Sequence, residues 1–170
     1  MSAKLQSGGP MPEMVLPALG GGEVKLGGTG RWQLVIVYRG KHCPICAHYL
    51  TEMEGMKDDF AKLSTEVVAV SCDPKEKAEA HAGELGLSLP VGYDLSIAQA
   101  RDLGLYVSNP RSAEETDRPF TEPGTFLVNP EGNLHIIDIS SAPFARPPLA
   151  GLLRGISFIQ ERNYPIRGTA

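Results

Sequence analysis

Short apolar runs alternate with glycine clusters over the first thirty residues of the chain. Residues 15–19 and 23–26 are the apolar runs, and the glycine clusters fall at residues 20–22 and 27–30. Short runs separated by glycines are typical of β-hairpins. Neither cluster stands between a strand and a helix, as a phosphate-binding loop must. We therefore expect a hairpin here and no phosphate site.

A buried strand followed by a helix is predicted next. Residues 35–38 end an apolar β-type run, and a short polar loop separates them from Pro44. Beyond Pro44, apolar residues recur at spacings of three and four, which marks one face of a helix about four to five turns long. They are Tyr49, Met53, Met56, Phe60 and Leu63. A second buried strand is expected over residues 66–72, which makes a β-α-β unit.

Helices and strands continue to alternate in the second half. Asp73 and Pro74 are expected as N-cap and first residue of a helix that ends near Gly86. Later elements are a strand at 89–93, a helix at 96–103, a hairpin of 126–128 with 134–139, and a helix from 147–148 to before Tyr164. Residues 106–123 show no period and are typical of a functional loop. The predicted sheet is mixed.

The length of 170 residues predicts a single domain. We place it at residues 13–165, after a flexible N-terminal segment at 1–12 and before a C-terminal tail at 166–170. The net charge of −4, with interspersed signs, leaves no basic stripe for a phosphate backbone, so no nucleic-acid partner is expected.

The sequence also allows a prediction of membrane association and of the cellular compartment. No apolar run reaches the length of a membrane span, and the first twelve residues lack the apolar core of a secretory signal. Three cysteines do not make a disulfide framework. We expect no membrane association and a cytoplasmic location, where thiols are kept reduced.

The candidate chemistry lies in two cysteines three positions apart at the start of the first long helix. Cys43 is predicted at the N-cap and Pro44 at the first helical position, with Cys46 one turn on. Residues at this spacing are close enough to form a disulfide. The helix N-terminus favours a thiolate, and Lys41 and His42 add positive charge nearby. We expect a reversible dithiol with one nucleophilic, partly exposed thiol.

Other interpretations of the pair remain open. Two inert buried cysteines are one, because free cysteine often behaves as a small apolar residue. Zinc bound by Cys43 and Cys46 with His42 or His48 is another, although a structural zinc site usually has more ligands than these. Covalent haem is excluded because Ala47, not histidine, follows the second cysteine. We expect no cofactor and no metal.

Three further residues are placed by the same patterns. Cys72 falls at the C-terminal end of a predicted strand, where α/β sheets often carry their sites. It is either an alternative resolving thiol or a small buried residue. His81 and His135 have no partner pattern and are expected at the surface or an edge.

The order of these segments resembles the thioredoxin-fold peroxiredoxins of the alkyl hydroperoxide reductase and thiol-specific antioxidant (AhpC/TSA) family. The likeness runs from about Met14 to Gly132 and rests on four segments. They are residues 38–46, 67–74, 87–90 with Asp94, and 124–132. The resemblance implies an α/β thioredoxin-like fold, with a mixed central sheet flanked by helices and an N-terminal β-hairpin.

The resemblance leaves the order of the two thiols open. In peroxiredoxins the attacking cysteine follows a Pro-x-x-x-Thr-x-x-Cys pattern. On this chain that pattern places Cys46 as attacker, Cys43 at the threonine and Arg39 at the proline. In thioredoxin-like reductases the first cysteine of the pair attacks, which would be Cys43.

A second departure concerns a cation. Peroxiredoxins bring an arginine to the peroxide from just ahead of a Thr-Phe strand, and Pro123 occupies roughly that place here. Arg39, Arg111 and Arg118 are the candidates for a substitute, because donors aimed at developing negative charge speed the attack.

The resemblance implies an antioxidant enzyme that reduces hydroperoxides through Cys43 and Cys46, with Arg39, His42 and Pro44 as supporting residues. An external thiol reductant, such as a thioredoxin- or glutaredoxin-like protein, would close the cycle. A thiol-disulfide oxidoreductase without significant peroxidase activity is the alternative, and a zinc-binding or redox-dead binding module is the third. The chain is a monomer or a homodimer.

Overall fold

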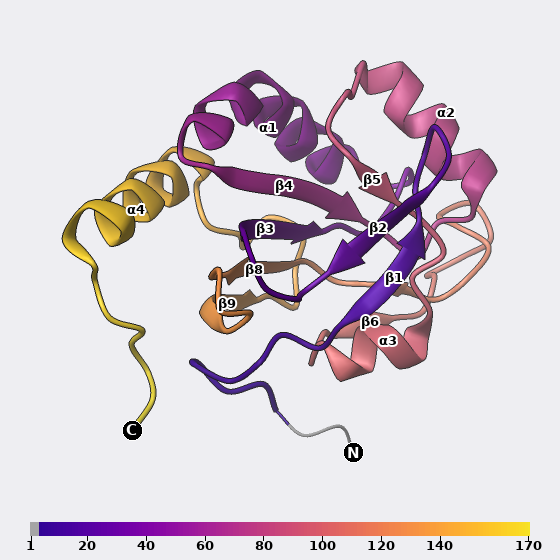
Figure 1. Cartoon of the computed structure of the whole chain (residues 1–170). Coiled ribbons are helices and arrows are strands. Elements are labelled where there is room, and N and C mark those ends of the chain that lie inside the picture. The colour runs from indigo at the N-terminus through magenta and orange to yellow at the C-terminus, as the bar shows by residue number, and fades with distance from the viewer. Residues whose placement is uncertain (1–3) are drawn as a thin grey trace.

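A five-stranded mixed sheet forms the centre of the structure, a computed structural model that describes residues 4–170 (Figure 1). In spatial order its strands are β5 (Val91–Gly92), β4 (Thr65–Val70), β3 (Trp32–Val37), β8 (Gly124–Val128) and β9 (Leu134–Ile139). β3 pairs in parallel with β4 and antiparallel with β8. The mixed sheet and the β-α-β unit predicted from the sequence are therefore confirmed.

Two long helices cover one face of the sheet. α1 (Pro44–Lys62) and α4 (Leu149–Arg162) bury their apolar sides there, and Leu50 and Ile156 pack in one cluster with Leu34 of β3. Spacings of three and four place such residues on one side of a helix, which is why the sequence pattern located both helices. Among the described helices, none is both long and apolar enough to cross a membrane.

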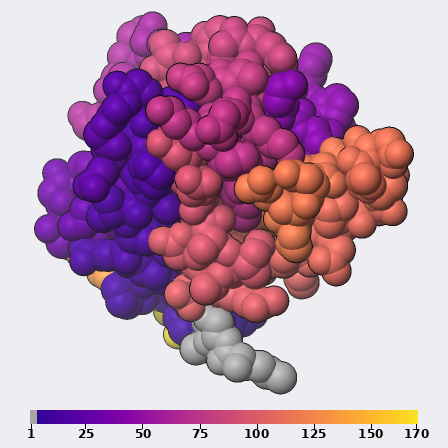
Figure 2. Space-filling model, turned by 90° about the vertical axis from the view of Figure 1, so that its right-hand side faces the viewer, coloured from indigo at the N-terminus to yellow at the C-terminus, as the bar shows by residue number. Residues whose placement is uncertain are grey.

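The N-terminal hairpin covers the opposite face. β1 (Met14–Pro17) and β2 (Glu23–Leu26) pair antiparallel as predicted, and they form a sheet of their own. Leu16 packs there with Leu103, which follows α3 (Ile97–Asp102). Main-chain hydrogen bonds join the hairpin to the segment around β5. Figure 2 shows the indigo hairpin lying alongside the magenta middle of the chain.

The start of α2 (Lys75–Leu85) corrects one prediction. Pro74 is the N-cap, and no side chain caps the helix. Asp73, expected as the cap, instead accepts a hydrogen bond of 2.8 Å from the backbone N–H of Lys41. The Asp73 carboxylate therefore binds the backbone N–H of a residue distant in sequence and does not cap α2. The end of α2 at Gly86, in a left-handed conformation, is as predicted.

The segment over residues 106–123 is more regular than predicted. It contains two short strands, β6 (Val107–Ser108) and β7 (Phe120–Thr121), which pair antiparallel. Strands of two residues leave no period for a sequence pattern to reveal. Their pairing brings the end of this loop back against the body of the protein, where Phe120 is buried.

The N-terminal segment contacts the sheet. Gly8 donates a hydrogen bond of 2.8 Å to the carbonyl of Leu134 in β9, and Met11 belongs to the core. Residues 1–3 of the predicted flexible segment lie outside the described residues. The predicted domain boundaries stay a prediction, but these contacts attach residues 8–11 to the central sheet.

Replacing Phe60 tests the packing that holds α1 on the sheet. Phe60 is fully buried, and Phe60→Ala removes most of its side chain from the core. We expect the free energy of unfolding to fall by about 3–5 kcal/mol, measured by urea denaturation. Phe158→Ala on α4 is the matched control, because Phe158 is 49% exposed. Equal losses in the two variants would contradict this packing.

Candidate active site

The loop between β3 and α1 positions the two cysteines. Gly40 has a φ of +133°, and a Cβ at that position would lie 2.6 Å from the Asp73 Oδ1 atom. Glycine therefore lets the backbone approach the carboxylate that accepts from the Lys41 N–H. This contact fixes the loop from which Cys43 enters the helix. Pro44, a predicted supporting residue, is the first residue of α1.

The two sulfur atoms lie at the first turn of α1. Cys43 is the N-cap, as predicted, and its Sγ atom accepts a hydrogen bond of 3.2 Å from the backbone N–H of Cys46. Both cysteines, like Cys72, are free. The spacing therefore produces the close dithiol that the sequence indicated.

The two thiols affect each other's ionisation, and the pKa of Cys43 is the lower of the two. The hydrogen bond from the Cys46 thiol lowers the pKa of Cys43 to about 6, with further contributions from the Cys46 N–H and Arg39, while burial opposes the shift. The same thiol–thiol hydrogen bond, with burial, raises the pKa of Cys46, and Arg146 acts in the opposite direction. These shifts favour a thiolate at Cys43 over one at Cys46.

Arg39 lies beside Cys43, as the sequence suggested. Its positive charge lowers the pKa of Cys43, and its guanidinium stands 4.7 Å from the centre of the Phe120 ring. Its Nε atom lies 3.0 Å from the Glu122 carboxylate, and both partners are largely buried. Phe120 belongs to β7, and Glu122 directly follows that strand. The long loop thus holds the cation that faces the thiolate.

A second arginine contacts the other sulfur and was missed by the sequence analysis. The Nη2 atom of Arg146 donates to the Cys46 Sγ atom over 2.7 Å. Its guanidinium lies 4.7 Å from the centre of the Tyr49 ring, and its Nε atom donates to the Pro143 carbonyl over 2.9 Å. The Tyr49 hydroxyl donates to the Pro147 carbonyl over 2.7 Å. The prolines near Arg146 were the only local feature of the sequence that could have drawn attention to this residue.

Arg111 and Arg118, the other two candidate cations, are paired elsewhere. Arg111 forms an ion pair with Glu115, and Arg118 forms one with Asp117. Among the described residues, neither makes a hydrogen bond or ion pair with Cys43 or Cys46.

The predicted exposure of the reactive thiol is wrong. The exposed fractions of Cys43 and Cys46 are 1% and 0%. Arg39 and Arg146 lie against the sulfur atoms, and both cysteines pack in the cluster beneath α1 and α4. The buried charge is tolerated because each sulfur has a cationic neighbour. A small surface pocket of about 210 Å³, lined in part by His42, lies beside the entry loop.

The histidines do not form a metal site with the dithiol. The His42 ring packs edge-on against Phe120 at 4.4 Å between ring centres, and burial lowers the pKa of His42. His48 is exposed. In residues 4–170, no group of three or more histidine, cysteine, aspartate or glutamate side chains is arranged to hold a metal ion.

Cys72 and His81 are both buried, and they pack against different residues. Cys72 packs in the hydrophobic cluster beneath the hairpin, not in the cluster that contains the dithiol, and burial raises its pKa to about 11. His81, expected at the surface, is buried by α2 with its ring 5.9 Å from the Tyr38 ring. His135 is half-buried against Trp32.

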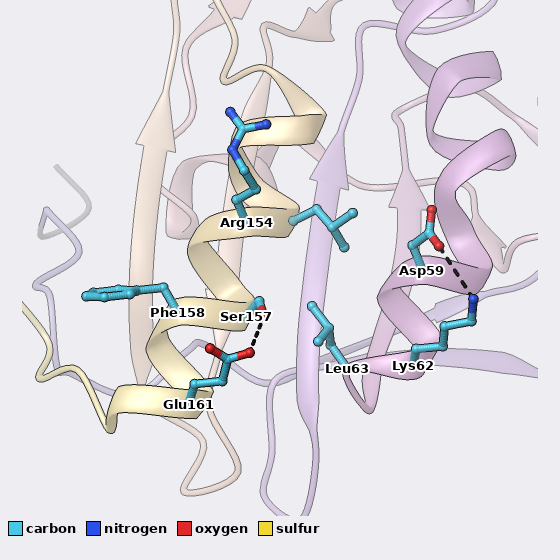
Figure 3. Close-up of a pocket in the computed structure, with 8 residues that line it drawn as sticks. Asp59, Lys62, Leu63, Arg154, Ser157, Phe158 and Glu161 are labelled. Carbon is cyan, nitrogen blue, oxygen red and sulfur yellow. Dashed lines mark hydrogen bonds and ion pairs between the residues drawn. The ribbon is translucent and has the colours of Figure 1, made fainter.

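A separate groove of about 460 Å³ lies between the last turns of α1 and α4 (Figure 3). Its walls carry an ion pair between Asp59 and Lys62 and a hydrogen bond from Ser157 to Glu161. It is lined by no cysteine. The chemistry of this chain therefore belongs to the first turn of α1 and not to this groove.

Solved structures with the same architecture are peroxiredoxins. A cysteine-to-serine mutant of peroxiredoxin 6 from Arenicola marina has a TM-score of 0.75 and 23% identity, covering 94% of this chain and 75% of that protein. A peroxiredoxin-like protein from Aquifex aeolicus has a TM-score of 0.76 and 14% identity, with coverages of 92% and 88%. At these identities the likeness shows the fold, which is the expected thioredoxin-like one.

Sequence comparisons identify the family. A peroxiredoxin homologue encoded in the rubredoxin operon of Clostridium pasteurianum is 26% identical over 138 residues, which is 74% of this chain and 73% of the homologue. The sequence profile of the AhpC/TSA family matches residues 7–137. That match spans far more than half of the chain. The chain therefore belongs to the AhpC/TSA family and is a peroxiredoxin-like, thiol-based oxidoreductase.

Proposed function

We propose that the protein reduces hydroperoxides with Cys43 as the attacking thiolate and Cys46 as the resolving thiol. The observation that carries this order is the position of Cys43 at the helix N-cap, where it accepts hydrogen bonds and holds the negative charge of the pair. The peroxiredoxin motif alone would give the attack to Cys46. The thiolate is the nucleophilic form of cysteine, so the charge distribution favours the reverse order.

The first step converts Cys43 to a sulfenic acid. Its thiolate attacks one oxygen of the hydroperoxide, the O–O bond breaks, and the second oxygen leaves as an alkoxide that becomes the alcohol on protonation. Arg39 is the donor beside this reaction, and its ion pair with Glu122 holds the guanidinium in place. A fixed cation next to the developing charge stabilises the transition state without reorganisation.

The second step forms the disulfide. The sulfur of Cys46 bonds to the sulfur of Cys43, and the sulfenic oxygen leaves as water. The peroxide has then been reduced by two electrons, and the two thiols have been oxidised. Cys46 is favoured over Cys72 as the resolving thiol because it hydrogen-bonds to Cys43, whereas Cys72 packs in the other hydrophobic cluster.

An external dithiol must then reduce the disulfide. A thioredoxin- or glutaredoxin-like protein is the partner proposed for this step, because exchange between dithiols restores both cysteines. A cytoplasmic location is part of the same proposal and is supported by the three free cysteines. The protomer acts as a monomer or a homodimer.

Thiol-disulfide exchange is a second candidate function. It is favoured by the same observation, because in thioredoxin-like reductases the first cysteine of the pair is the attacking one. Cys43 would then attack a substrate disulfide, and Cys46 would release the mixed disulfide. Both candidates use the dithiol in the same order and differ in the substrate.

The ionisation of Cys43 gives a direct test of the thiolate assignment. The pKa of Cys43 in the folded protein lies below the usual thiol value, so the charge is present above about pH 6 and is lost as the pH falls through that value. We expect the ultraviolet absorbance of thiolate in the reduced protein to rise with a midpoint near pH 6. Cys46→Ala, in which Cys43 is the remaining thiol of the pair, should keep this transition and move it upward by removing a donor.

Cys72→Ser is the control for the titration. The pKa of Cys72 is raised to about 11, so its removal should leave the transition near pH 6 unchanged. A transition that disappears in Cys46→Ala and remains in Cys43→Ser would contradict the assignment.

Single-turnover oxidation of the pre-reduced protein tests the order of the thiols. With hydrogen peroxide, Cys46→Ser should react as fast as the parent and stop at a sulfenic acid on Cys43, trapped by dimedone and located by mass spectrometry. Cys43→Ser should lose on the order of 100-fold in rate or more, because the activated thiolate and its donor are then removed.

Two results would change the proposal. Rapid oxidation of Cys43→Ser together with a slow Cys46→Ser would reverse the roles of the thiols. A parent protein that reacts with peroxide no faster than a free thiol, while Cys46→Ser forms a stable mixed disulfide with a disulfide substrate, would assign thiol-disulfide exchange.

A further inference from the structure

We infer that Arg146 makes Cys46 the second thiolate once Cys43 has been oxidised, so that the two thiols are activated one after the other by two different arginines. This inference rests on the proposed order, in which Cys43 attacks and Cys46 resolves. Arg39 serves the first thiol, and Arg146 serves the second.

The contacts of Arg146 hold its guanidinium against the Cys46 sulfur. Its Nη2 atom lies 2.7 Å from the Cys46 sulfur, which is fully buried. The guanidinium is held from two other sides, by the Tyr49 ring and by the Pro143 carbonyl. The Tyr49 hydroxyl also holds the loop itself through its hydrogen bond to Pro147. A long flexible side chain is therefore fixed on one sulfur atom.

The charge on Cys43 keeps Arg146 from acting too early. While Cys43 is a thiolate, it accepts the hydrogen bond of the Cys46 thiol and disfavours a second negative charge beside it. Oxidation to the sulfenic acid removes that charge. The attraction of Arg146 for a Cys46 thiolate is then opposed by burial alone, and the second thiol ionises more readily than before.

Protons and electrons balance over these reaction steps. The alkoxide takes a proton from water and departs as the alcohol, and Cys46 gives up its thiol proton to the hydroxide formed in that step. The Cys46 thiolate then bonds to the Cys43 sulfur, the S–O bond of the sulfenic acid breaks, and the oxygen leaves as hydroxide. The products are the disulfide, the alcohol and one hydroxide ion, and the charge is −1 before and after.

Arg146 also has a free donor for the leaving oxygen. Within residues 4–170, its buried Nη1 atom has no hydrogen-bond partner. Arg146 lines a surface pocket of about 570 Å³ together with Ser140 and Pro147. The guanidinium therefore contacts the buried sulfur through Nη2 and keeps Nη1 as a donor for the leaving oxygen.

The experiment separates the two steps in the full-length protein. In pre-reduced Arg146→Gln, the rate of disulfide formation after hydrogen peroxide should fall by about tenfold or more, because the resolving thiolate has lost its cation. The peroxide step, measured as sulfenic acid formation in the Cys46→Ser background, should be the same with and without Arg146→Gln. Dimedone trapping and non-reducing mass spectrometry follow the two steps.

A pH profile distinguishes activation from simple positioning. If Arg146 acts by ionising Cys46, the slow disulfide formation in Arg146→Gln should recover as the pH is raised, because hydroxide then removes the proton. Arg146→Lys keeps the charge and loses the planar guanidinium, so it should be intermediate. Arg154→Gln, the same change at an exposed position on α4, is the control and should match the parent.

Failure of this inference is distinguishable from failure of the proposed order. Disulfide formation that is unchanged in Arg146→Gln, or slowed equally at all pH values, would overturn the role of Arg146. A slower peroxide step in the Cys46→Ser background would do the same, because Arg146 would then serve the first thiol. A slow peroxide reaction of Cys46→Ser, in which Cys43 is the remaining thiol of the pair, would overturn the order itself, whatever Arg146 does. If Arg146→Gln does not fold, Tyr49→Phe, which frees Pro147, should slow disulfide formation alone.

Discussion

One negative charge, shared by two buried sulfur atoms, is the constraint on which the rest of the site depends. A buried charge is costly unless it is paired and hydrogen-bonded. Cys43 receives the Cys46 N–H, the Cys46 thiol and Arg39. A buried cation in turn needs a negatively charged partner, and Glu122 is that partner for Arg39. The requirement therefore spreads from two sulfurs to groups far apart in the sequence.

The fold meets this requirement at one edge of the central sheet. The turn from β3 into α1 brings Arg39 and Cys43, and the end of β7 brings Phe120 and Glu122. The connection between β9 and α4 brings Arg146. The packing of α1 and α4 on one face is what places that connection over the first turn of α1. The core thus sets the distances that the chemistry needs.

The sequence revealed the parts of this site that are local. Cys43 and Cys46 share one helical turn, so spacing and capping rules located both, and Arg39, four residues before Cys43, followed from its place in the peroxiredoxin pattern. The hairpin, α1 and the mixed sheet followed from patterns confined to single elements. Peroxiredoxin motifs, in contrast, gave Cys46 the attacking role without any information on which sulfur carries the charge.

Long-range partners explain what the sequence did not reveal. Arg146 stands 100 positions after Cys46, and no spacing rule connects them. Asp73 was assigned to the nearest helix because a local cap is all that a pattern can offer, whereas the fold supplies the Lys41 N–H. The thiols were expected to be partly exposed because helix N-termini are often open. Here Arg146, from a distant segment, covers the Cys46 sulfur.

The size of the pKa shift at Cys43 indicates that the two cysteines ionise as a coupled pair. A helix N-terminus is worth up to about 2 kcal/mol to a partly buried anion, which is roughly one and a half pKa units. The pKa of Cys43 falls from 9.0 to about 6, although burial acts in the opposite direction. The helix end alone is therefore too weak, and the balance comes from the Cys46 thiol and Arg39. Because each sulfur sets the ionisation of the other, oxidation of Cys43 necessarily changes the acidity of Cys46. A lone cysteine at this helix end would have neither the low pKa nor a partner that responds to its oxidation.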